Sequence, residues 1–140
     1  MKPSQIIISI AVIATLGASF WADLNDTHVY NLDWPPHARF HAIVALFVTS
    51  GYGLIALWLI WRQSADQFVC KTVAALMPFV SWYGHYMAFF LVGPSDTELI
   101  LGLPANLLGG GIIMGISAIG YFQFRRERRI LLNADYGSKR

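Results

Sequence analysis

The chain has 140 residues, of which 56% are hydrophobic and only 13% are charged. A soluble domain usually carries about a quarter charged residues, so this composition argues against an ordinary soluble protein. The net charge is only +2, and no aromatic residues interrupt the basic stretch near the C-terminus, which argues against nucleic-acid binding. The single cysteine, Cys70, excludes an internal disulfide and a cysteine-based zinc site.

Four apolar segments are long enough to cross a bilayer, which requires about 20 mainly apolar residues. They cover approximately residues 5–22, 40–61, 68–93 and 99–124. We therefore predict that residues 1–140 form a single all-α integral membrane domain, an antiparallel four-helix transmembrane bundle. An alternative for the first segment is a cleaved signal peptide, because a lysine precedes an apolar run that ends in small residues.

The charged residues predict how the bundle is oriented. One side carries Lys2, Arg62, Lys71, Arg125, Arg126, Arg128 and Arg129. The opposite loops carry Asp23, Asp26, Asp33, Asp96 and Glu98, with only Arg39 among them. The positive-inside rule then predicts that both termini are cytoplasmic, with the arginines anchored at anionic lipid headgroups. This prediction suits a bacterial inner membrane and a eukaryotic internal membrane equally well.

The second helix has a clear start signal. An aspartate cap followed by prolines, in the sequence Asp33-Trp34-Pro35-Pro36, predicts a helix that begins near Pro35. His37 and His41 then lie one turn apart on the first turns of this helix.

His85 is the most informative residue of the third segment. It follows a stripe of small residues that we expect to face the interior of the bundle. Ionisable residues at such a depth are candidates for function. Asn106 lies at a similar depth in the fourth segment, and a hydrogen bond between the two side chains would be worth about 0.6–2 kcal/mol. A neutral His85 bonded to a neighbouring polar group, without further function, is the simpler alternative.

These polar residues predict a pocket in the outer half of the bundle for a lipid-like ligand of the sterol, isoprenoid or quinone type. Ligand pockets are usually aromatic, with few polar groups. The expected lining residues are Asn106, Trp82, Tyr83, Tyr86, Tyr52 and Arg39. Isomerase-like proton transfer would use His85, Asp26 and His41, because burial can tune the pKa values of imidazoles and carboxylates.

Two other functions stay open. The spacing of His37 and His41 lets two imidazoles reach one metal ion, and a mixed imidazole and carboxylate site suits zinc, iron or copper. The candidate ligands are Asp23, Asp26, His28, His37, His41 and His85. The same residues can equally be a solvated loop and a helix end at the membrane interface.

The other function is that of a non-enzymatic accessory subunit, which forms an oligomer or joins a larger membrane complex through its glycine-rich fourth segment.

The segment N-D-T-H at residues 25–28, followed by W-P-P-H-A-R-F-H at residues 34–41, resembles an uncharacterised family of small four-span membrane proteins. The resemblance implies that His28, His37, Arg39 and His41 act as a unit, and it implies no reaction. A weaker similarity in span count, early aspartate and aromatic pocket is to the emopamil-binding and sigma-2 receptor superfamily, whose pockets hold sterol-like ligands. That similarity implies a lipid ligand.

Overall fold

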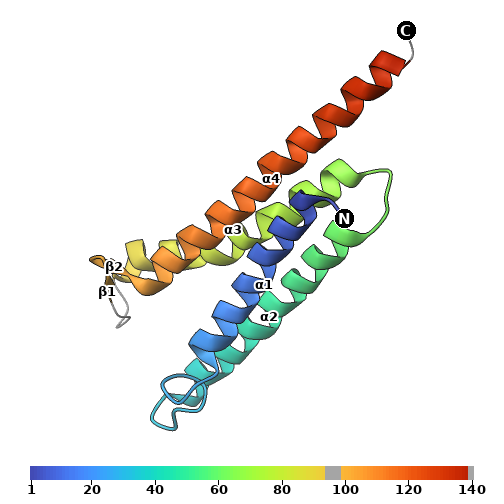
Figure 1. Ribbon diagram of the computed structural model, residues 1–140. Helices are drawn as coiled ribbons and strands as arrows, with labels where there is room; N and C mark the ends of the chain where they lie inside the picture. The colour runs from blue at the N-terminus through green and yellow to red at the C-terminus, as the bar shows by residue number, and fades with distance from the viewer. Residues whose placement is uncertain (94–98, 139–140) are drawn as a thin grey trace.

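The computed structural model describes residues 1–93 and 99–138 (Figure 1). Its elements are α1 (Pro3–Asp23), α2 (Pro36–Trp61), α3 (Gln67–Val92), β1 (Leu99–Ile100), β2 (Leu103–Pro104) and α4 (Ala105–Ser138). Each of the four helices is long and apolar enough to cross a membrane. The prediction of four spanning-length helices is therefore confirmed, and it indicates a multi-pass membrane protein.

The helices form two antiparallel pairs, α1 with α2 and α3 with α4 (Figure 1). α1 packs against the other three helices, and α3 contacts both α2 and α4. The pairs lie close together at the end that holds the N-terminus and diverge at the opposite end (Figure 1). We call the end where the pairs lie close together the basic end; it holds Lys2 and the connection 62–66. We call the end where they diverge the histidine end; it holds the loop 24–35 and the β1–β2 hairpin.

Small and aliphatic side chains fill the contacts between the helices. Near the basic end, the buried cluster consists of Ile8, Val12, Ala56, Ile60, Ala74 and Ala75. At Gly120, an added Cβ would lie 2.7 Å from Ile8 Cγ1, so α4 approaches α1 closely only because this position lacks a side chain. Large apolar side chains such as Phe47 and Phe122 are mostly exposed, as expected for side chains that contact lipid.

Polar bonds between helices are concentrated at the basic end. Ser4 is fully buried, and it donates from its backbone N and from Oγ to the carboxylate of Glu127, at 3.1 and 2.6 Å. Trp61 Nε1 donates to Ser9 Oγ at 3.1 Å. These bonds join the start of α1 to α4 and α2.

One buried bond joins α3 and α4 at the middle of the bundle. Pro78 lies inside α3 and has no N–H to donate to the carbonyl of Ala74, which loosens the helix there. In the same turn, the carbonyl of Ala75 accepts a bond from the buried Ser117 Oγ at 2.7 Å.

Ser117→Ala should therefore destabilise the bundle by about 0.6 kcal/mol, and by no more than about 2 kcal/mol. Thermal unfolding of the detergent-purified protein would measure this change. Ser50→Ala is the matched control, because among the described residues Ser50 Oγ bonds only to the carbonyl of Leu46 in its own helix. Equal midpoints for the two variants would contradict a stabilising role for the bond between the helices.

Two boundaries differ from the sequence-based predictions. Residues 99–104 form the β1–β2 hairpin rather than part of a helix, with positive φ at Leu101 and Gly102 in the turn. α4 continues to Ser138, and its 34 residues span about 51 Å, well beyond a hydrocarbon core of about 30 Å. The predicted start of α2 near Pro35 is confirmed, since the helix begins at Pro36, but it has no side-chain cap, so Asp33 does not cap it. Asp96 and Glu98, which we expected in an acidic loop, lie outside the described residues.

Candidate functional site

The loop between α1 and α2 is organised by Asn25. Its Nδ2 donates to the carbonyls of Trp21 and Ala22, at 3.0 and 2.8 Å, which closes the end of α1. Its Oδ1 accepts from Thr27 N at 2.9 Å, from Thr27 Oγ1 at 2.6 Å and from His28 N at 3.1 Å. This is the local bonding that favours asparagine in turns, and it explains the N-x-T-H pattern structurally.

The second half of the motif holds the loop against α2. Arg39 Nε donates to the carbonyl of Val29 at 2.9 Å. The His28 and Trp34 rings meet edge to face, with centroids 4.8 Å apart. His28 and Arg39 thus belong to one structural unit, whereas the rings of His37 and His41 contact each other, with centroids 4.4 Å apart.

His37 and His41 form an exposed pair on the first turns of α2. Their Nε2 atoms are 3.1 Å apart. Within residues 1–93 and 99–138, no three His, Cys, Asp or Glu side chains come close enough together to hold a metal ion. Asp26 is exposed in the loop, and His28 packs on Trp34. Of the expected metal ligands, His37 and His41 are the pair whose imidazole nitrogens are in direct contact.

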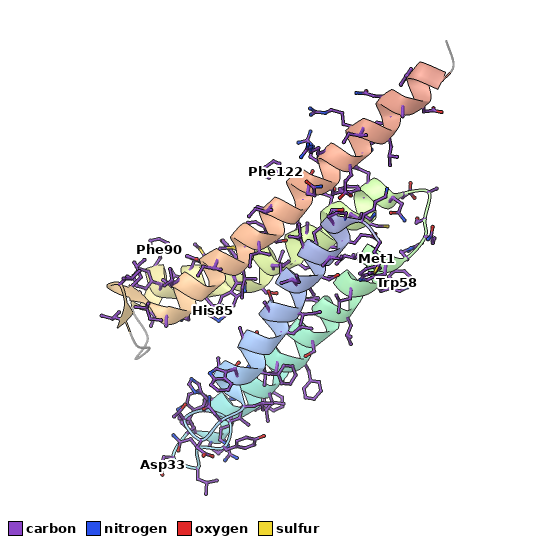
Figure 2. All side chains as sticks on the ribbon, viewed as in Figure 1. Met1, Asp33, Trp58, His85, Phe90 and Phe122 are labelled. Atoms are coloured by element: carbon purple, nitrogen blue, oxygen red, sulfur yellow. The ribbon has the colours of Figure 1, made fainter. Side chains whose placement is uncertain are left out.

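His85 lies where the two helix pairs diverge. Figure 2 shows it on the side of the α3–α4 pair that faces the α1–α2 pair. We expected the whole stripe of small residues on α3 to be buried. Ala74 and Pro78 are buried, but His85 and Ala88 are exposed, because the pairs have separated at that level.

Two further polar groups lie beside His85. Trp82 is only 6% exposed, its ring centroid is 4.7 Å from that of His85, and its Nε1 has no acceptor among the described residues. Asp23, the last residue of α1, is partly buried and interacts electrostatically with His28 and His85. We call Asp23, His28, Trp82 and His85 the Asp23 cluster. The sequence-based prediction chose Asp26 over Asp23, although Asp23 continues the helical spacing of Thr15 and Ser19.

Residues 6–88 match the sequence model of DUF6640, a protein family of unknown function. The match covers more than half of the chain and includes the whole Asp23 cluster. The chain belongs to this family. No curated protein and no solved structure matches it.

In this DUF6640 member, the other expected ligand-binding residues do not line one pocket with His85. Asn106 Oδ1 accepts from the backbone N of Leu107 at 2.9 Å and makes no bond with His85. Tyr86 Oη donates to the carbonyl of Leu107 at 2.7 Å, which joins α3 to α4. Tyr52 on α2 and Tyr83 on α3 are 43% and 62% exposed. The aromatic residues are therefore divided between a helix contact and the outer surface.

Proposed function

We propose that this multi-pass membrane protein binds a lipid-like molecule between the two helix pairs at the histidine end. The observation that carries the proposal is the Asp23 cluster, in which Asp23 from α1 interacts with His85 from α3. In a bilayer, ionisable side chains are costly, and they usually serve ligand binding or proton transfer. Here they come from both pairs and interact electrostatically where the pairs diverge.

The chemistry of the cluster suits a ligand with an apolar body and a single hydroxyl or carbonyl group. The indole N–H of Trp82 is buried without an acceptor among the described residues, and such a group in lipid needs a partner. A ligand oxygen would accept this bond, with the His85 imidazole at a neighbouring position. Sterols, isoprenoid alcohols and quinones combine an apolar body with such a polar group. The similarity to the emopamil-binding superfamily favours the same class of ligand.

Proton transfer is a natural extension of this binding site. An imidazole and a carboxylate can act as acid and base on either side of a double-bond shift. Asp23 takes the place that we first assigned to Asp26, because Asp23 is the carboxylate that interacts with His85. We place the basic end in the cytoplasm by the positive-inside rule, so the site opens toward the opposite leaflet.

Photolabelling tests this proposal. The full chain in lipid nanodiscs would be labelled with a photoreactive sterol and, separately, with a photoreactive ubiquinone analogue. We expect His85→Ala to lower the labelling by at least one probe about tenfold, as loss of a hydrogen bond worth about 1.4 kcal/mol implies. His41→Ala is the matched control, since this exposed imidazole contacts His37 instead. Equal labelling of the wild type and His85→Ala would contradict the proposal.

Metal binding is a second candidate, favoured by the His37 and His41 pair. Two imidazoles on one tetrahedral zinc ion would have nitrogens about 3.4 Å apart, close to the 3.1 Å observed. The remaining ligands would be water or a second copy of the chain. Native mass spectrometry of the same samples would detect a stoichiometric metal that His37→Ala removes. A co-purifying larger assembly would instead support an accessory subunit.

A further inference from the structure

A cavity of about 410 Å³ lies at the basic end, far along the bundle from the Asp23 cluster. The cavity is half open, and it is lined by the start of α1, the end of α2 with the connection to α3, the start of α3 and the second half of α4. Four basic side chains line it, Lys2, Arg62, Lys71 and Arg128, and no acidic residue of the described chain does. Such a cavity attracts an anion.

Lys71 gives the strongest indication that the cavity binds a ligand. It is only 2% exposed, and its Nζ lies 5.1 Å from the ring centroid of Phe124. Among the described residues, no carboxylate forms an ion pair with it. Glu127 is the acid that interacts with it electrostatically, but that carboxylate is already bonded to Ser4. A buried ammonium without an ion-pair partner is costly, and a bound anion would offset that cost.

Aromatic rings hold the two arginines of the cavity in place. Among the described residues, neither guanidinium forms an ion pair with a carboxylate. The Arg62 guanidinium lies over the Trp58 ring, and that of Arg128 lies over the Phe68 ring, each 4.4 Å from the ring centroid. The backbone of Arg62 is fixed in addition, because its carbonyl accepts from Gln67 Nε2 at 2.8 Å. Stacked guanidinium groups keep their N–H donors free, and their planar shape matches two oxygens of a phosphate group.

We propose that this cavity binds a phosphate group, either in the headgroup of an anionic lipid or in a free anion. Basic pockets between transmembrane helices are known to hold anionic headgroups. Trp61, Phe68 and Leu131 add apolar wall to the same cavity, which suits the glycerol and first methylenes of a lipid. The proposal is independent of the ligand at the histidine end.

The test compares three probes on the full chain in a neutral detergent: phosphatidylglycerol, phosphatidylcholine and inorganic pyrophosphate. Binding would be followed by native mass spectrometry and by the shift of the thermal unfolding midpoint, which rises when a ligand binds only the folded state. We expect Lys71→Met to weaken binding of phosphatidylglycerol at least about tenfold. Without ligand, the same variant should unfold at an unchanged or higher temperature, because an unpaired buried charge has been removed.

Arg125→Gln is the matched control, since Arg125 is basic and exposed on α4 but does not line the cavity. Arg62→Gln is a second test of the cavity if Lys71→Met fails to fold. Phosphatidylglycerol binding that pyrophosphate does not displace would identify a lipid headgroup. Pyrophosphate binding that Lys71→Met abolishes, without a preference among lipids, would identify a free anion. Equal binding of both lipids without pyrophosphate binding, or an equal loss in Arg125→Gln, would overturn the proposal.

Discussion

Gly110→Ala should destabilise the bundle by about 1–3 kcal/mol, the usual cost of overpacking a well-filled contact. An added Cβ would lie 2.5 Å from Cε3 of Trp82, and this indole is held between α1 and α4. The ring cannot move away easily, because Tyr86 in the next turn is bonded to the carbonyl of Leu107. The midpoint of thermal unfolding in detergent would measure the loss.

Gly109→Ala is the matched control for this prediction. Gly109 is the preceding residue of α4, and an added Cβ there would meet nothing within 4 Å. Both changes give the same gain in helix propensity, so the difference between them isolates the contact with Trp82. Gly109→Ala should leave stability unchanged or slightly raised. If both variants unfold at the same temperature, α3 and α4 are not as close at Gly110 as the structure shows.

Glu127→Ala should destabilise the protein by about 1–3 kcal/mol, because it leaves buried donors without an acceptor. Ser4 N and Ser4 Oγ both donate to this carboxylate, and Gln123 Nε2 donates to it at 3.3 Å. Ser4 N is one of the first amides of α1, so Glu127 caps that helix from another helix and complements its dipole. Thermal unfolding at neutral pH would measure the loss.

A double-mutant cycle would separate this contact from other effects of the change. Ser4→Ala removes the hydroxyl, and the cycle of Ser4→Ala with Glu127→Ala reports the coupling between the two side chains. We expect a coupling of about 0.5–3 kcal/mol, the range found for side chains in direct contact. Additive losses would show that Glu127 acts on stability without its bond to Ser4.

The four helices long and apolar enough to cross a membrane could be predicted because hydropathy is a local property. A window of about 20 apolar residues has few alternatives to a helix that crosses a bilayer. Residues 99–104 were misassigned for the same reason, since a short apolar run cannot be distinguished from a helix by hydropathy alone. The turn that Asn25 forms with Thr27 and His28 is also a local feature, because its bonds join residues that are close in sequence.

Which residues lie together in the candidate site depends on how the helices cross, and no local sequence pattern specifies that. The divergence of the two pairs exposes His85. Asn106 lies in the same pair as His85, but its Oδ1 accepts from the backbone N of Leu107 instead. Asp23, rather than Asp26, is the carboxylate that interacts electrostatically with His85. The imidazoles of His37 and His41 contact each other, and within residues 1–93 and 99–138 no third ligand completes a metal site with them.

The sequence by itself determined the number of helices long enough to cross a membrane, the collection of basic residues at one end and the histidines at the other. Only the tertiary structure showed that Lys71 is buried beside Phe124 in a cavity that Lys2, Arg62 and Arg128 complete. The reason is physical. Hydropathy and charge are sums over neighbouring residues, whereas a site depends on helix separations set by single contacts such as that of Gly110 with Trp82.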